Sequence, residues 1–339
     1  MDKDLTLAQG REYLAIPGPS VIPDAVLRAM HRAAPNIYEG TLHEMTHSVV
    51  KDLRKIARTR QHVAMYIANG HGAWEAALSN VIAPGERIFI PATGRFAHGW
   101  ADIAAGLGIE VDLLDFGRAG TFDLDRIAET LRADSGHDIK AVLATHVDTS
   151  SSVRNDIAAL RALLDEVGHP ALLMADCIAS LGCDRFEMDD WGVDVMVAAS
   201  QKGLMVPPGL AFVFFSARAA EVRAGMSRVS RYWDWTPRAE PKEYYQHFGG
   251  TAPTHHLYGL RTALDLMLDE GLEHVWARHE RLAQAIWAAC EIWGQDGPLR
   301  LNITDRSLRS HAVTALRLGA PHGTALRNWV TDYLGLTLG

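Results

Sequence analysis

Polar side chains that could do chemistry follow four apolar runs, each at the point where a predicted strand ends. They are Asn-Gly-His-Gly at 69–72, Thr145 with His146, Asp176, and Ser-Gln-Lys-Gly at 200–203. In open parallel α/β sheets, ligands bind outside the carboxyl ends of the strands. The sequence therefore predicts one crevice on which an amine, a carboxylate and a glycine-rich turn converge.

Lys202 is the candidate nucleophile of this crevice. It follows the apolar run 193–200 and precedes Gly203 and the Pro-Pro-Gly segment 207–209, so we expect structured elements to hold it. Desolvation at such a position lowers the pKa of a lysine amine and makes it competent to attack a carbonyl. The alternative is an ordinary surface lysine.

Asp176 ends the apolar segment 171–176, so we expect its carboxylate at the end of a buried strand. A buried carboxylate needs a cationic partner. A protonated pyridine nitrogen would serve, and the pairing would strengthen the ring as an electron sink. A capping or salt-bridged aspartate is the alternative interpretation.

The helix predicted to begin near His71 offers a candidate phosphate seat. Its first N–H groups and positive dipole end would face an anion, and Gly70 and Gly72 would allow a close approach. Glycine before a helix is also common turn chemistry, and that reading stays open.

Short apolar runs alternate with helical periodicity along the chain, which is typical of βαβ units and a largely parallel sheet. We expect helices at 73–82 and 157–168, a long helical stretch after residue 255 that is interrupted at Gly271, and a final helix at 323–335. The predicted strands are 63–69, 87–92, 109–115, 140–145, 171–176, 193–200, 210–216, 299–304 and 312–318.

Bulk composition indicates an enzyme of two domains. The chain has 339 residues, of which 48% are hydrophobic, and this exceeds the usual size of one domain. A net charge of -8 without a basic run argues against nucleic acid as a partner. No apolar leader or membrane-length apolar stretch is found, so we expect a cytoplasmic protein. The cysteines, Cys177, Cys183 and Cys290, are interpreted as reduced core thiols.

With these motifs the chain resembles the class V, fold-type I, pyridoxal-phosphate-dependent aminotransferases, specifically the alanine–glyoxylate and serine–glyoxylate group. The most specific feature is the spacing of Asp176 and Lys202 combined with SQKGLMVPPG at 200–209. The other matching segments are IPGPS at 16–20, NGHGAWEA at 69–76, ATGRF at 92–96, residues 145–152, DCIASLG at 176–182, GTAPT at 250–254 and LYGLR at 257–261.

The resemblance implies the PLP-dependent transferase fold, a mainly parallel sheet with flanking helices plus a smaller C-terminal α/β domain. We expect an N-terminal arm at 1–22, a large cofactor-binding domain at 23–268 and a small domain at 269–339. The arginine that binds the substrate carboxylate in this family would lie beyond residue 339, so the small domain is expected to be incomplete.

The resemblance also implies site roles and a cofactor, pyridoxal 5'-phosphate. Lys202 would be the Schiff-base lysine and proton shuttle, and Asp176 would pair with the pyridine nitrogen. The other implied cofactor contacts are Gly70, His71 and Gln201 at the phosphate, Phe96 stacked on the ring, and Ser150 or Ser151 near the phenolic oxygen or the substrate. Phe248 and Thr251 lie in a segment that this family contributes to the phosphate of the other subunit, which implies a homodimer. Some members have tryptophan in place of Phe96, and phenylalanine can still stack on the ring. Some have tyrosine in place of Phe248, and phenylalanine lacks the hydroxyl that would reach the phosphate.

The implied reaction is ping-pong transfer of an amino group from alanine, serine or a similar small amino acid to glyoxylate or pyruvate. A lyase or a desulfurase on the same scaffold is an alternative, although a desulfurase needs a cysteine on a loop. Binding without catalysis is another. A zinc hydrolase is suggested by His43-Glu44-Met45-Thr46-His47, which fits HExxH, against the interpretation of a solvated helix. The aromatic run 231–235 either packs a loop or shapes the pocket.

Overall fold

The computed structural model describes residues 13–339, so most of the predicted arm at 1–22 lies outside the described residues. A seven-stranded sheet with the order β2-β10-β9-β8-β5-β3-β4 forms the centre. Its strands are β2 (His62–Tyr66), β3 (Arg87–Ala92), β4 (Glu110–Asp115), β5 (Ile139–Thr145), β8 (Leu172–Asp176), β9 (Val195–Ala199) and β10 (Ala211–Phe215). All seven coincide with predicted strands, and only β10 runs against its neighbours. The predicted α/β class with a mainly parallel sheet is confirmed.

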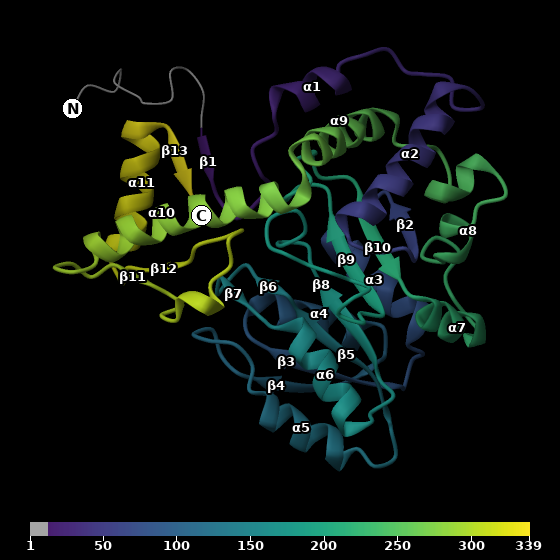
Figure 1. Cartoon of the computed structure of the whole chain (residues 1–339), viewed down its shortest axis with the longest axis horizontal. Coiled ribbons are helices and arrows are strands. Elements are labelled where there is room, and N and C mark those ends of the chain that lie inside the picture. Colours follow the sequence, from purple (N-terminus) through teal and green to yellow (C-terminus); the bar gives the residue numbers. More distant parts are fainter. Residues whose placement is uncertain (1–12) are drawn as a thin grey trace.

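Helices cover both faces of the sheet and bury it in two apolar clusters (Figure 1). One face is covered by α2 (Thr41–Ile56), α5 (Leu124–Ala133), α6 (Ile157–Val167) and α9 (Thr254–Glu270), and the other by α3 (Gly70–Val81), α4 (Arg95–Gly106) and α7 (Ala217–Gly225). Because both faces are buried, the central strands are apolar throughout rather than alternating. The short helices α1 (Asp24–Met30) and α8 (Thr236–Ala239) lie at the periphery of the sheet.

The register of the parallel strands brings their polar ends together. Thr145 at the end of β5 pairs with Asp176 at the end of β8, and Asp176 pairs with Val197 of β9. A hairpin of β6 (Val147–Asp148) and β7 (Val153–Arg154) follows β5 directly. The sheet therefore presents the predicted residues at one edge.

The C-terminal part follows α10 (Leu272–Trp293), the long helix that crosses Figure 1. It contains β11 (Arg300–Leu301), η2 (Arg306–Leu308), β12 (Leu316–Arg317), α11 (His322–Leu334) and β13 (Leu336–Leu338). The strands predicted at 299–304 and 312–318 shrink to the two-residue pair β11 and β12, since they form a separate hairpin rather than joining the main sheet. β13 instead pairs in parallel with β1 (Tyr13–Ala15), which was not predicted because three residues are too few to show a period.

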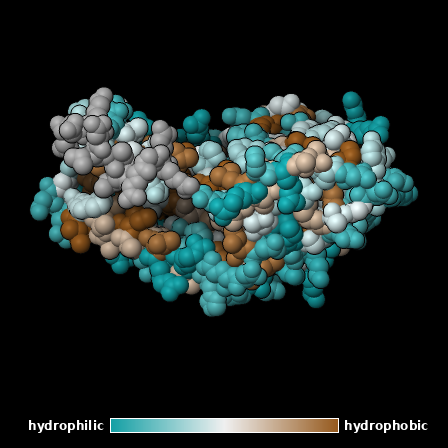
Figure 2. Space-filling model, turned by 90° about the horizontal axis from the view of Figure 1, so that it is seen from above, coloured by the Kyte–Doolittle hydropathy of each residue, from teal (hydrophilic) through white to brown (hydrophobic). Residues whose placement is uncertain are grey.

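Exposed apolar side chains gather in this C-terminal part, and Figure 2 shows brown patches there, at the left of the view. They include Ile286 and Trp293 on α10 and Trp329 on α11. Apolar surface of this kind is typical of faces that contact other protein segments. No helix among residues 13–339 is both long and apolar enough to cross a bilayer.

His146 is a buried histidine behind the site, and it links stability to pH. Its Nδ1 lies 2.9 Å from the Ser180 hydroxyl, and burial lowers the pKa of His146 to about 4. In the unfolded chain the imidazole titrates near about 6.5. A depressed folded pKa means that the stability is fully present above about pH 6.5 and is lost as the pH falls toward 4.

We predict that the titration of His146 lowers the free energy of unfolding by about 2 kcal/mol as the pH falls from about 7.5 to about 5. Urea denaturation at several pH values measures the slope. His146→Gln should flatten it, and the same change at exposed His322 is the control. An equally steep slope in His146→Gln and in the wild type would contradict this assignment.

Candidate active site

A cavity of about 310 Å³ opens at the carboxyl ends of the central strands. Six predicted site residues line it: Gly70, His71, Phe96, Asp176, Gln201 and Lys202. The remaining lining residues are Gly18, Pro19, Asn69, Trp74, Val147, Thr149, Ile178, Ala179 and Pro208. The structure thus brings the predicted amine, carboxylate, aromatic ring and helix start into one space.

Lys202 lies on the tight turn that follows β9. Backbone bonds from Met205 N to Lys202 O and from Val206 N to Ser200 O, at 2.9 and 3.0 Å, close this turn. Gly203 is required beside it, because a Cβ there would lie 2.9 Å from the sulfur of Cys183. Burial lowers the pKa of the Lys202 amine, and the neighbouring acidic groups of Asp176 and Cys183 oppose this shift. The half-buried amine is thereby more nucleophilic at neutral pH than a surface lysine.

Asp176 is the buried carboxylate of the cavity. Burial raises the pKa of Asp176 to about 7, and the nearby Asp148 adds to the rise. The Ile178 N–H donates to Oδ1 at 2.8 Å and, together with Trp74 and Lys202, opposes it. Within residues 13–339 no basic nitrogen lies within 4.0 Å of this carboxylate, so a cationic ligand would find an unclaimed partner here.

The phosphate seat predicted at the start of α3 takes a particular form. Asn69 caps the helix, and its Oδ1 accepts from His71 N at 3.1 Å and from Gly72 N at 3.3 Å. Gly70 packs so closely that a Cβ would lie 2.5 Å from Ile178. Opposite, Gln201 Oε1 is buried without a hydrogen-bond partner among the described residues. The positive end of the α3 dipole favours an anion at this place, and the NH2 group of a glutamine amide could donate to one.

Phe96 stands at the start of α4, edge-on to Trp74 with ring centroids 6.2 Å apart. Its backbone N–H donates to Asp148 Oδ2 at 2.9 Å, which fixes where the helix begins. Gly94 precedes it in extended conformation, and a Cβ at that position would collide with the Asp148 carboxylate. Asp148 therefore places the aromatic ring, although the sequence singled out only its serine neighbours.

These residues fit pyridoxal phosphate on chemical grounds. The buried carboxylate, with no basic nitrogen within 4.0 Å among residues 13–339, suits a protonated pyridine nitrogen, and the amine suits an aldehyde. The start of α3 and the NH2 group of Gln201, which also lines the cavity, suit a phosphate. The same cavity would hold a neutral apolar ligand poorly, because Asp176 and Gln201 would stay uncompensated.

Four predicted site residues do not line the cavity. Ser150 Oγ donates to Asp148 Oδ1 at 2.6 Å, and Ser151 is fully buried. Their neighbour Thr149 lines the cavity instead. Phe248 is buried in the core against Tyr244, with ring centroids 5.7 Å apart, and Thr251 is exposed.

The sequence reasoning missed several lining residues. Asn69 could have been found as a helix cap, and Trp74 lies one helical turn after Gly70. Gly18 and Pro19 lie in the matching segment IPGPS, but no spacing in the sequence places that segment beside Lys202.

Two of the alternatives, the zinc hydrolase and the desulfurase, find no support in the geometry. His43 stacks on Tyr244 at 3.7 Å and His47 meets His247 edge-on, and no group of three metal-binding side chains occurs in the part of the chain that the structure describes. Burial raises the pKa of Cys177 and Cys183, the latter to about 12, so neither is a thiolate at neutral pH.

The aromatic run 231–235 packs against α3, as the first of its two interpretations held. Tyr66 Oη and Asn80 Nδ2 both donate to Trp233 O, at 2.9 and 2.7 Å, and Trp235 N donates to Asn80 Oδ1 at 3.1 Å. The Trp235 side chain is fully buried.

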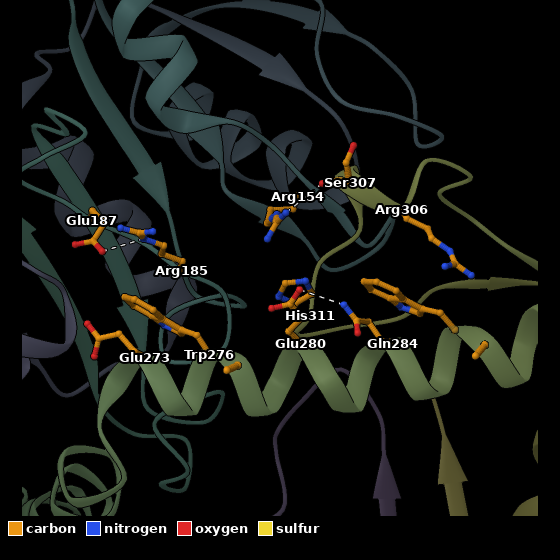
Figure 3. A pocket seen from close by; sticks show the side chains of 13 residues that line it. Arg154, Arg185, Glu187, Glu273, Trp276, Glu280, Gln284, Arg306, Ser307 and His311 are labelled. Atoms are coloured by element: carbon orange, nitrogen blue, oxygen red, sulfur yellow. Dashed lines mark hydrogen bonds and ion pairs between the residues drawn. The ribbon is translucent and has the colours of Figure 1, made fainter.

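A second, larger cavity of about 770 Å³ lies between α10 and the segment around His311 (Figure 3). Polar side chains of this cavity bond one another: Arg185 donates to Glu187 at 3.0 Å, and Gln284 donates to Glu280 at 3.1 Å. This cavity is the weaker candidate for catalysis, because its acidic and basic side chains are paired and no lysine with a lowered pKa lines it.

Asp176 should titrate near neutrality in the protein without cofactor. We predict that the infrared difference spectrum between about pH 5.5 and about pH 8.5 contains a carboxylic-acid carbonyl band that disappears in Asp176→Asn. Asp125→Asn, at an exposed position on α5, is the matched control. Retention of the band in Asp176→Asn would refute the assignment.

Known proteins share both the sequence and the fold. Residues 12–291 match the family described as aminotransferase class-V. The chain is 36% identical to the serine–glyoxylate aminotransferase of Arabidopsis thaliana, over 99% of this chain and 84% of the relative. It is also 36% identical to the L-aspartate–glyoxylate aminotransferase of Paracoccus denitrificans, over 89% and 76% of the two chains.

Among solved structures, the alanine–glyoxylate aminotransferase from Nostoc sp. superposes with a TM-score of 0.88 at 25% identity, covering 97% of this chain and 86% of that one. The ureidoglycine–glyoxylate aminotransferase from Bacillus subtilis gives 0.87 at 26% identity, with 96% and 83% covered. Sequence, fold and cavity agree, and the chain belongs to the class V aminotransferases.

Proposed function

We propose that this aminotransferase uses pyridoxal 5'-phosphate to move an amino group from a small amino acid, such as alanine or serine, to glyoxylate or pyruvate. The observation that carries the proposal is the presence of Lys202 and the buried Asp176 in one cavity. The acceptor is supported by relatives that are named for glyoxylate.

Each part of the cofactor has a candidate holder in the cavity. Asp176 would pair with the protonated pyridine nitrogen, and Phe96 would stack on the ring. Gly70, His71 and Gln201 would hold the phosphate, and Lys202 Nζ is the amine suited to its aldehyde carbon. When bound, the cofactor supplies an electron sink for the pair left behind when an amino acid loses its α-proton.

Lys202 is the proposed acid and base. Its lowered pKa leaves more of the amine neutral at working pH, so Nζ can take the proton from the α-carbon and deliver it again on the cofactor side. A cation that offsets the burial of Asp176 would keep its carboxylate ionised, so its charge and the cofactor's would support each other. Water would release the donor's carbon skeleton as a 2-oxo acid while its amino group stays on the cofactor. The second 2-oxo acid would take up that amino group with loss of water.

Ser150 and Ser151 would act from behind the site. The Ser150 hydroxyl donates to Asp148 and accepts a hydrogen bond from Arg95 N at 2.8 Å. These bonds support a role in placing α4 and Phe96 rather than direct contact with the cofactor. The proposed organisation keeps residues 23–268 as the cofactor-binding domain and 269–339 as the small domain.

A cytoplasmic homodimer with shared sites completes the proposal. Thr251 is exposed and would reach the phosphate of the other subunit, while the buried Phe248 anchors its segment. The exposed apolar side chains of α10 and α11 offer further surface for contacts.

The absorption spectrum tests the function directly. With pyridoxal phosphate, the protein should show a visible band that bleaches with L-serine or L-alanine and returns with glyoxylate or pyruvate. Lys202→Ala should lose the normal band and lower kcat by about 10⁴-fold or more, since it lacks both nucleophile and base. Lys51→Ala, at an exposed position on α2, should match the wild type.

A wild-type protein that forms no band with added cofactor would refute the proposal. A band that forms but never responds to any amino acid would refute amino-group transfer while leaving cofactor binding intact.

The shared site predicts a subunit effect. Sedimentation should show a dimer, and Thr251→Ala should weaken cofactor binding about tenfold, the scale of one hydrogen bond to a charged group. Thr254→Ala, three residues along, is the control. A monomer that binds cofactor as tightly as the dimer would contradict the shared site.

A further inference from the structure

Residues 16–20, here called the strap, cross the cavity between β1 and α1. Ser20 fastens the strap to the turn that carries Lys202, with its N–H donating to Gln201 O at 2.9 Å and its Oγ to Lys202 O at 2.8 Å. Gly18 and Pro19 of the strap form part of the cavity wall.

The strap also meets the end of the lysine side chain. Lys202 Nζ donates a hydrogen bond to the carbonyl of Pro17. Within residues 13–339 no carboxylate oxygen lies within 4.0 Å of this Nζ, so the Pro17 carbonyl takes the place that an acidic partner would fill.

Gly18 makes this approach sterically feasible. Its φ of +139° is in the region that favours glycine, and a Cβ there would lie 2.6 Å from Lys202 Cε, 2.8 Å from Cδ and closer still to Nζ. Any other residue would have to push the lysine away or displace the strap.

We propose that the strap positions the catalytic amine: the Pro17 carbonyl holds Lys202 Nζ whenever that amine is free, and Ser20 is the positioning residue that sets the strap at the required distance. This inference rests on the proposed role of Lys202.

The physical basis is the flexibility of lysine. Four rotatable bonds let a free amine sample many positions, and each attack on a carbonyl requires one of them. A neutral carbonyl acceptor fixes one N–H of the amine without supplying a negative charge that would favour the protonated form strongly. The amine therefore stays near its point of action and stays nucleophilic.

The inference is tested by the rate at which pyridoxal phosphate attaches to Lys202 in the cofactor-free protein. Borohydride reduction at timed intervals traps the attached fraction, and mass spectrometry of the Lys202 peptide quantifies it. Pyridoxine 5'-phosphate has the same ring and phosphate but no aldehyde, so its affinity measures non-covalent binding alone.

Ser20→Ala should slow attachment about five- to tenfold, the factor expected for one lost hydrogen bond, with the affinity for pyridoxine 5'-phosphate unchanged within about twofold. Ser20→Thr, which keeps the hydroxyl, should restore the wild-type rate. This rescue separates positioning through the hydroxyl from a general loss of packing.

Gly18→Ala should slow attachment further than Ser20→Ala. Gly85→Ala is its matched control, because Gly85 also has a positive φ, +85°, but a Cβ there meets nothing within 4 Å. Thermal melting of each variant identifies loss of fold, and if Gly18→Ala does not fold, the Ser20 pair decides.

Wild-type attachment rates in Ser20→Ala, or equal rates in the alanine and threonine variants, would overturn the inference. So would a Gly18→Ala rate equal to that of Gly85→Ala. If the wild type itself never attaches the cofactor, the proposed function falls and the role of the strap falls with it.

Discussion

A buried carboxylate with no cationic partner among residues 13–339 is the constraint on which this site depends. Asp176 ends the central strand β8, and the sheet cannot expose it to water without losing its apolar packing. The protein meets part of the cost with the Ile178 N–H. The remaining effect of burial raises the pKa of Asp176 to about 7. At neutral pH the carboxyl group is therefore divided between its neutral form and the charged form that can pair with a cation. A bound cation is the natural way to resolve that balance.

A second buried carboxylate organises the opposite wall. Asp148 accepts from the N–H groups of Phe96 and Ser150 and from the Ser150 hydroxyl, so one side chain fixes both the start of α4 and the hairpin after β5. Its proximity also raises the pKa of Asp176. Positioning and electrostatics are therefore supplied by the same residue, and its replacement would disturb both at once.

The central sheet was predictable because both of its faces are covered, which leaves long apolar runs that end in polar residues. Register followed from parallel pairing, so the convergence of Asp176 and Lys202 could be deduced from the sequence. The hairpin at 147–154 could not, because Thr149, Ser150 and Ser151 are chemically alike. In the structure the hydroxyls of Ser150 and Ser151 both bond Asp148, and Thr149 lines the cavity. The short strands β1 and β13 were not predicted for a different reason: each forms by pairing with the other, which lies at the opposite end of the sequence.

The pairing of β1 with β13 gives the strap a fixed origin. At one end it continues a strand that is hydrogen-bonded to the C-terminal part, with Tyr13 N donating to Gly335 O at 2.9 Å, and at the other end it is fastened to the turn of Lys202. Five residues span at most roughly 17 Å when fully extended. A polypeptide cannot stretch beyond its contour length, so the strap is an inextensible tether. Any displacement of α11 and β13 away from the sheet that the strap cannot span must therefore pull on the Lys202 turn, break the bonds of Ser20 or separate β1 from β13.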